Sequence, residues 1–206
     1  MTEKTLPPIT LAMTGASGAA YGIRLLECLL AAQRRVYFMI SDAARVVVRM
    51  ELALELPTGV AELEQFFSQR FATKENQLKV FGNMDWLAPP ASGTGGKIPM
   101  VICPASGGLI SAIATGASTN LVQRAADVAI KEKRPLIIVP REMPASAIHL
   151  ENQLKLARLG ATIMPASPGF YQNPKSLEDI VDFVVARILD QLDIPHDLLP
   201  HWGHTN

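Results

Sequence analysis

Short apolar runs recur along the chain, and longer segments that mix polar and apolar residues separate them. Runs of this length with few charged residues are typical of strands that are buried on both faces of a parallel sheet. Most of the intervening segments repeat apolar residues at three- and four-residue spacing, which predicts amphipathic helices. The predicted strands cover residues 9–13, 36–40, 77–81, 100–103, 136–139 and 162–164, and the predicted helices include residues 21–32, 121–130 and 150–159.

This alternation predicts an α/β fold with a doubly wound, mostly parallel sheet and helices on both faces, in the Rossmann-like or flavodoxin-like three-layer form. A length of 206 residues suits one domain, so we expect residues 1–206 to fold as a single unit. A last long helix follows Ser176, a candidate N-cap, and ends near Leu192. Two prolines exclude a continuous helix beyond it. Residues 193–206 are therefore expected to form an extended tail, in which Trp202 reaches a neighbouring subunit.

One segment interrupts the alternation. Residues 85–99 are rich in glycine and proline and contain Trp86. This composition predicts a mobile loop between the third and fourth strands.

Charge and cysteine content exclude several classes of function. Lysine plus arginine and aspartate plus glutamate each number 19, so no net charge is available to hold nucleic acid or an anionic membrane surface. The first apolar run ends at Thr14 and Gly15, too early for a signal peptide or a membrane span. Cys28 and Cys103 lie inside apolar runs, which favours a reducing, cytoplasmic setting. No Cys/His cluster with zinc spacing is present, so no metal is expected.

The balance of apolar and charged residues is unusual for a small soluble chain. Hydrophobic residues make up 49% of the sequence and charged residues only 18%. Some apolar surface is therefore expected to be covered by partner subunits, most simply in a symmetric homo-oligomer.

Three short loops, at residues 14–18, 103–108 and 140–144, directly follow predicted strands. In an open parallel sheet such loops gather at the carboxyl ends of the strands, where these folds hold their ligands. The glycine spacing of the first loop does not match the dinucleotide fingerprint, which disfavours a dinucleotide. Asp42, just after the second strand, could contact a ribose or simply cap a helix, and Ser41 before it is an equally good ligand contact. The chain is therefore expected to be organised around one pocket for a small molecule.

Each loop also has a purely structural interpretation. The turn at residues 106–108 could cradle a phosphate with free amides, or the small residues could serve only the tight turn. Arg141 and Glu142 after a buried strand would face the ligand crevice, unless they form a surface salt bridge. In the crevice, Glu142 could act as a general acid or base. For cations elsewhere on helices, and for Glu51, the structural alternative is a solvated face.

In their order along the chain, these motifs closely resemble those of the UbiX-type flavin prenyltransferases. The first carries TGASGA at residues 14–19, the second CPAS at 103–106, the third PRE at 140–142, and a fourth PGFY at 168–171. The number and order of the matches make the resemblance specific. Further matching segments are residues 21–22, 85–86, 88–90, 124–128, 149–152 and 182–187, and the resemblance extends from about residue 9 to residue 203.

The resemblance implies an enzyme that joins the dimethylallyl group of dimethylallyl phosphate to N5 and C6 of reduced FMN and releases phosphate. The product would be prenylated FMN, the cofactor of UbiD-type decarboxylases, which in many bacteria act in ubiquinone synthesis. The resemblance further implies a homododecamer and no requirement for a metal.

Catalytic and flavin-binding roles follow from the resemblance by position. It implies that Ser17, Glu51 and Glu142 move protons as the bonds to N5 and C6 form. The flavin would lie along the loops that follow the strands. The implied FMN contacts are Gly15, Ala16, Ser17, Ser41, Ser106, Gly107, Gly108, Leu109 and Arg141.

A second set of residues would bind the prenyl donor. A phosphate that leaves an allylic carbon needs fixed positive charge nearby, and the allylic cation needs an aromatic enclosure that excludes water. The implied donor-binding residues are Tyr171, Arg187, Arg124 and Lys131 at the phosphate, and Trp86 and Trp202 around the allylic group.

Two alternatives remain open. An FMN-dependent decarboxylase of a cysteine-containing substrate would share the fold and a Pro-Ala-Ser turn, although the charged pair Arg141-Glu142 argues against it. A flavin-binding scaffold without chemistry would keep the loops but would not require Glu142. The chain also carries Ala105 and Gly107 where family members carry Cys and Thr, and a turn that binds through its backbone should tolerate both changes.

Overall fold

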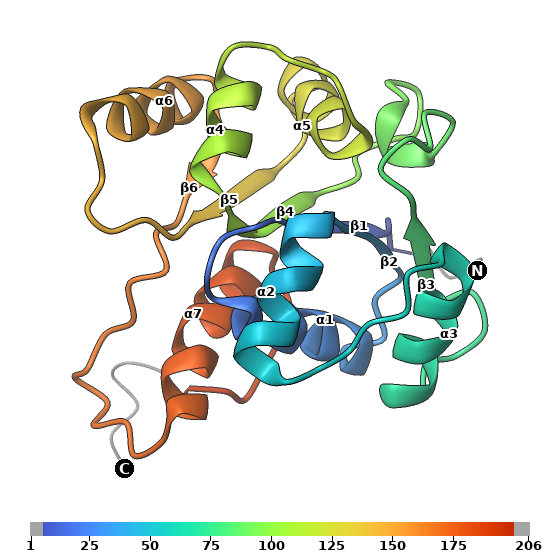
Figure 1. Cartoon of the computed structure of the whole chain (residues 1–206), viewed down its shortest axis with the longest axis vertical. Coiled ribbons are helices and arrows are strands. Elements are labelled where there is room, and N and C mark those ends of the chain that lie inside the picture. The colour runs from blue at the N-terminus through green and yellow to red at the C-terminus, as the bar shows by residue number, and fades with distance from the viewer. Residues whose placement is uncertain (1–5, 200–206) are drawn as a thin grey trace.

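Six parallel strands form one sheet at the centre of the molecule (Figure 1). The computed structural model describes residues 6–199. The strand order is β3-β2-β1-β4-β5-β6, so the direction of winding reverses between β1 and β4. The predicted parallel, doubly wound sheet is therefore confirmed. The strands are β1 (Ile9–Met13), β2 (Val36–Ile40), β3 (Leu78–Phe81), β4 (Met100–Ala105), β5 (Leu136–Pro140) and β6 (Thr162–Ile163).

A different set of helices covers each face of the sheet, which confirms the predicted three layers (Figure 1). Successive strand residues point to opposite faces, so the sheet contributes to two cores. Leu11 and Met13 lie in the core with α1 and α7, whereas Ala12 lies in the core with α4 and α5. The first core contains α1 (Ala19–Ala31), α2 (Asp42–Leu52), α3 (Val60–Arg70) and α7 (Leu177–Gln191); the second contains α4 (Gly107–Ala114), α5 (Leu121–Lys131), α6 (Ala147–Arg158) and the short 3-10 helix η1 (Pro89–Ala91).

The strands match their predicted bounds more closely than the helices do. β1 and β2 have the predicted ends, but β4 continues past residue 103 to Ala105, with a shift in register against β5 after Ile102. Helix α6 begins three residues before its predicted start, because Ser146 caps it. Helix α3 was not predicted, although its Leu63 and Phe67 are fully buried.

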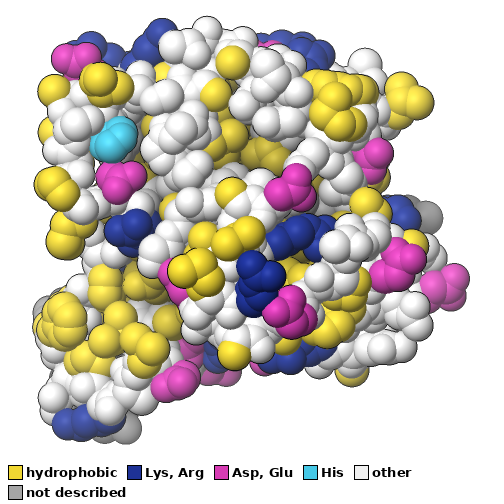
Figure 2. Space-filling view, viewed as in Figure 1, with side chains coloured by type: hydrophobic (Ala, Val, Ile, Leu, Met, Phe, Trp, Pro, Cys, Tyr) yellow, Lys and Arg dark blue, Asp and Glu magenta, His cyan; other side chains and the backbone are white. Residues whose placement is uncertain are grey.

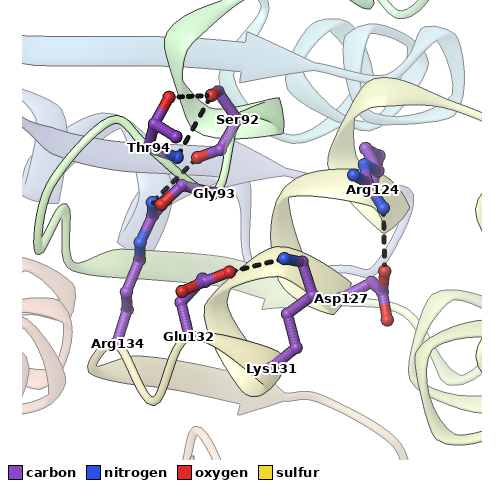
Figure 3. Close-up of polar contacts among 8 residues, drawn as sticks. All are labelled: Ser92, Gly93, Thr94, Arg124, Asp127, Lys131, Glu132 and Arg134. Atoms are coloured by element: carbon purple, nitrogen blue, oxygen red, sulfur yellow. Dashed lines mark hydrogen bonds and ion pairs between the residues drawn. The ribbon is translucent and has the colours of Figure 1, made fainter.

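Residues 85–99, predicted to be a mobile loop, pack against the second core. Ala88, Ala91 and Ile98 are buried. The buried Arg134 donates from Nη2 to the carbonyl oxygens of Ser92 at 2.8 Å and Gly93 at 2.9 Å (Figure 3). The segment is therefore attached to the α5 side of the molecule.

Within residues 6–199, no helix is long and apolar enough to cross a membrane. The same range holds no group of three or more His, Cys, Asp or Glu side chains arranged to hold a metal ion. Trp202 lies outside the described residues.

Candidate active site

Thr14 joins the loop after β1 to the loop after β4, at the point where the strand order reverses. Its hydroxyl donates to the Pro104 carbonyl at 3.0 Å and accepts from the Ser106 amide at 2.9 Å. The Thr14 amide also donates to the Pro104 carbonyl at 3.1 Å. Thr14 is buried, so these bonds are shielded from water. No role was predicted for Thr14; the only signal in the sequence is a hydroxyl at the end of a buried strand.

The loop after β1 also lies close to the start of α2. A Cβ at Gly15 would lie 2.5 Å from the Cβ of Ala43, so only glycine fits there. Ser41 accepts a hydrogen bond from the Ala44 amide at 3.1 Å and donates its own amide to the Met13 carbonyl at 3.0 Å. Three of the predicted FMN contacts, Gly15, Ala16 and Ser41, therefore lie around the ends of two neighbouring strands.

The first turn of α4 is open toward the same edge. Ser106 is the N-cap, and its hydroxyl accepts from the Leu109 amide at 3.4 Å. The amides at a helix start have no partner within the helix, so those of Gly107 and Gly108 are available to a ligand. A Cβ at Gly108 would have no atom within 4 Å, which leaves room beside this turn. The predicted contacts from Ser106 to Leu109 therefore form one donor-rich surface.

Glu51 caps the N-terminus of α1 from the end of α2. Its carboxylate accepts from the Gly18 amide at 2.9 and 3.1 Å and from the Ala19 amide at 2.8 Å. Gly18 has a positive φ of 105° and no side chain to cap the helix, so a distant carboxylate takes that role. The structure thus brings Glu51 next to Ser17, although 33 positions separate Glu51 from Gly18 in sequence.

The surroundings of Glu51 favour its ionised form. Burial alone would raise the pKa of Glu51, but hydrogen bonds from the Ser17 hydroxyl and from the Ala19 and Gly18 amides, with the charge of Arg141, lower this pKa below its usual value. A carboxylate held in this way can accept a proton from a ligand more readily than it can donate one.

Arg141 and Glu142 follow β5 and point to different parts of the site. The charge of Arg141 acts on Glu51, and its buried Nε has no hydrogen-bond partner among residues 6–199. Glu142 instead faces α4, since its Oε2 lies 3.5 Å from where a Cβ of Gly107 would be. His149 Nε2 lies 2.9 Å from the same point. No role was predicted for His149, although it stands within one of the matching segments.

These groups fit FMN. A buried guanidinium nitrogen without a partner and the free amides at the start of α4 suit phosphate or carbonyl oxygens. The open side of Gly108 gives the ligand access. The residues expected to contact the flavin therefore lie along one edge of the sheet, as predicted.

The predicted donor cluster is not assembled within one chain. Arg124 and Lys131 lie on α5, on one face of the sheet, and pair with neighbouring acids: Arg124 with Asp127 at 3.1 Å, and Lys131 with Glu132 (Figure 3). Arg187 lies on α7, across the sheet from them. A seven-residue spacing predicts that two side chains share a face of a helix, but it does not specify which face of the sheet that helix covers.

Tyr171, in contrast, packs against α7, the helix that carries Arg187. The Tyr171 ring meets the edge of Phe183 at a centroid distance of 5.6 Å, and Arg187 follows Phe183 by four residues on α7. Residues four apart lie on the same helix face. These two predicted phosphate ligands therefore lie on one side of the molecule.

Trp86 lies away from the flavin loops, beyond the end of β3. β2 separates β3 from β1, so about 10 Å lies between β3 and the first loop at the usual strand spacing. Trp86 is 43% exposed and lines a cavity of about 540 Å³ with Met84 and Leu87. The other predicted aromatic residue, Trp202, is outside the described range.

Exposed apolar side chains also occur elsewhere on the surface. Figure 2 shows them gathered at the lower left, where the segment before α7 and the start of that helix lie in Figure 1. Phe170, Tyr171 and Leu177 are each more than 60% exposed. Such patches are unusual on a monomer and are typical of surfaces that contact other subunits.

Comparison with known proteins agrees with this geometry. A family model described as Flavoprotein matches residues 1–189. A curated relative from Pseudomonas aeruginosa, named flavin prenyltransferase UbiX, is 58% identical over 198 residues, which cover 96% of this chain and 95% of the relative.

Solved structures are similar over almost the whole chain. AnUbiX in complex with FMN and dimethylallyl pyrophosphate has a TM-score of 0.85 and 32% identity, covering 97% of this chain and 99% of that structure. A dodecameric FMN-dependent UbiX-like decarboxylase from Escherichia coli O157:H7 has a TM-score of 0.82 and 34% identity, covering 95% and 99%. The chain therefore belongs to the flavoprotein family and, within it, to the UbiX-type flavin prenyltransferases.

Proposed function

We propose that this flavin prenyltransferase joins the dimethylallyl group of dimethylallyl phosphate to N5 and C6 of reduced FMN and releases phosphate. One observation carries the proposal: acidic groups lie on both sides of the loops around Arg141, which are rich in hydrogen-bond donors. Ser17 and Glu51 lie on one side of these loops, and Glu142 lies on the other. AnUbiX, whose structure contains FMN and dimethylallyl pyrophosphate, supports a flavin and an allylic donor as the ligands.

The reaction needs both a proton donor and a proton acceptor. The bond from N5 to the allylic carbon displaces phosphate, which leaves with the C–O bond pair, and releases the N5 proton. The bond from C6 then requires a proton to be added to the double bond of the prenyl group and one to be removed from C6. Reduced FMN would supply N5 and C6 as the nucleophilic positions. Glu51, ionised and hydrogen-bonded to Ser17, would accept protons on one side of the flavin, and Glu142 would exchange protons on the other side.

The cations of α5 would act in the active site of a neighbouring copy. Arg124 and Lys131 cannot reach Tyr171 and Arg187 within one chain, because the sheet lies between them. A relative that is dodecameric supports an assembly in which such surfaces meet. The exposed Leu87, Met143 and Ile148 would be covered in the same contacts, which would bring fixed positive charge to the leaving phosphate.

The product would be handed to a UbiD-type decarboxylase, and both proteins would work in the cytoplasm. The free thiols of Cys28 and Cys103 support a reducing compartment. Prenylated FMN is the group that passes between the two proteins in this proposal.

An anaerobic assay tests the reaction. The protein is incubated with dithionite-reduced FMN and either dimethylallyl phosphate or dimethylallyl pyrophosphate, and the flavin is analysed by mass spectrometry. We expect a flavin heavier by one prenyl unit with the monophosphate. If the flavin is modified only with the pyrophosphate, the prenyl donor is dimethylallyl pyrophosphate and not the monophosphate. Unmodified flavin with both would contradict the proposal, and carbon dioxide release from a peptide with a C-terminal cysteine would then support the decarboxylase alternative.

The variant Glu142→Gln tests the proton-transfer role of that carboxylate. Because glutamine has the same shape but cannot exchange a proton, we expect prenyl transfer to slow by about a hundredfold while FMN affinity stays unchanged. The matched variant Glu151→Gln, on the exposed part of α6, should leave both quantities unchanged. Normal turnover of Glu142→Gln would contradict the proton-transfer role of Glu142.

A further inference from the structure

The ring of His149 is fixed by the cap of α6. The Ser146 hydroxyl accepts from the His149 amide at 3.3 Å, and the Ser146 amide donates to His149 Nδ1 at 3.3 Å. This reciprocal arrangement is a capping box. In the neutral ring that accepts this bond at Nδ1, the hydrogen is on Nε2. The cap therefore makes Nε2 a hydrogen-bond donor and fixes its direction.

That donor points at the start of α4, where Glu142 also lies. A Cβ at Gly107 would be 2.9 Å from His149 Nε2 and 3.5 Å from Glu142 Oε2. Both side chains therefore occupy the space that a larger residue at position 107 would fill. Glycine at this position lets the imidazole lie above the first turn of α4, beside the carboxylate.

The surroundings leave these two groups to act on each other. His149 and Glu142 are the titratable members of the small cavity between α4 and α6, whose other lining residues are Ala105, Gly107, Ile110, Pro140 and Gln153. Helix α4 carries no titratable side chain. Arg141, the neighbouring charge on the same loop, acts on Glu51. A second contact, from Asn152 Nδ2 to Ser111 Oγ at 2.9 Å, holds α6 against α4.

We propose that His149 is a positioning residue for Glu142: its Nε2–H donates to the Glu142 carboxylate during turnover and holds that group aimed at the flavin. This inference rests on the proposed function, in which Glu142 exchanges a proton. Contacts of this kind are often long in the free enzyme and shorten when the substrate binds.

The variant His149→Gln separates this role from the cap. Glutamine is a usual partner at this position of a capping box, so it keeps the bond to the Ser146 amide and removes the donor over α4. We expect kcat to fall about tenfold, as for loss of one hydrogen bond to a charged group, with FMN affinity unchanged. The loss should appear in kcat rather than in the KM for dimethylallyl phosphate, because His149 acts through the Glu142 carboxylate.

The matched control is Ser146→Ala, which removes a capping hydroxyl but keeps the imidazole. It should lower the melting temperature and leave kcat unchanged. An unchanged kcat in His149→Gln would overturn the proposal. Loss of FMN binding or of folding in that variant would also overturn it, because His149 would then be purely structural.

A double-mutant cycle with Glu142→Gln completes the test. If His149 acts through Glu142, adding His149→Gln to Glu142→Gln should cost no further activity. Two fully additive losses would contradict the positioning role. Normal turnover of Glu142→Gln alone, with slow turnover of His149→Gln, would instead show that the proposed role of Glu142 has failed.

Discussion

The carboxyl edge of β1 and β4 and the outer face of α5 differ in how their polar groups are paired. At the edge, bonds within one chain connect the polar groups: Thr14 joins two loops, and Glu51 caps α1. On α5, Arg124 and Lys131 pair only with acids beside them on the surface. One chain thus brings together the loops proposed to contact FMN, while the cations proposed to bind the donor phosphate face outward.

Surface ion pairs of this kind contribute little to stability, so α5 can exchange them for other partners at small cost. The Thr14 link cannot do so, because it is buried. In the proposed assembly the two regions meet only between copies, so activity would depend on assembly, whereas the loops proposed to contact FMN depend on the fold of one chain.

The largest expected effect tests whether the two regions meet between copies of the chain. Arg124→Ala should lower prenyl transfer by about a hundredfold, since a fixed charge at the leaving phosphate is lost, and should leave FMN affinity unchanged. Co-expressing it with Glu142→Gln should restore about a quarter of the activity, the share of mixed sites with both groups intact. Steady-state kinetics and flavin fluorescence titration measure the two quantities. No recovery in verified mixed oligomers would indicate that both residues act from the same chain.

A smaller effect is expected at the edge itself. Thr14→Val keeps the shape of the side chain but leaves the Ser106 amide without its partner, so FMN affinity should fall by about tenfold. Thr14→Ser retains the hydroxyl and should bind FMN almost as well as the natural chain. Isothermal titration with FMN compares the three proteins. Equal affinity for all of them would exclude Thr14 as the link between the loops.

The smallest effect concerns the pH dependence of stability. Because the folded state lowers the pKa of Glu51, its contribution is present above the pKa of the unfolded chain and is lost as pH falls through the folded value. Glu51→Gln should therefore be less stable than the natural chain at pH 7 by about 0.5 kcal/mol, a value kept small because the carboxylate is partly exposed. The difference should vanish in acid. Thermal unfolding at pH 7 and pH 3 measures it, and an equal difference at both values would contradict the assignment.

Most of the sheet could be predicted from the sequence because its strands are short, buried apolar runs with clear ends. β1 ends at Met13 and β2 at Ile40, and the polar residues that follow them, Thr14 and Ser41, mark the boundaries. β4 was predicted too short because Pro104 lacks an amide hydrogen, yet the strand continues through it. The start of α6 was missed because its cap depends on His149, an uncommon partner for Ser146.

The residues of the candidate site also differ in whether the sequence alone can indicate them. Residues such as Ser106 and Arg141 could be predicted because they stand directly after strands whose ends meet at one edge. The link from Thr14 to Pro104 spans 90 positions and the cap from Glu51 to Gly18 spans 33, so neither leaves a local pattern in the sequence. The placement of Arg124 depends on which face of the sheet receives α5, and helical spacing carries no information about that.

The tight contact between Gly15 and Ala43 limits how this enzyme could be redesigned for bulkier isoprenoid donors. Ala43 and Glu51 stand near opposite ends of one rigid helix, α2. A side chain at residue 15 would push on the first end, where its Cβ would lie 2.5 Å from that of Ala43, and would move Glu51 at the other away from α1. Space for a longer chain must therefore be created elsewhere. The resemblance implies that Trp86 encloses the allylic group, and the segment around it borders a cavity and carries no residue of the flavin loops. We therefore predict that substitutions in this segment change donor size without disturbing proton transfer.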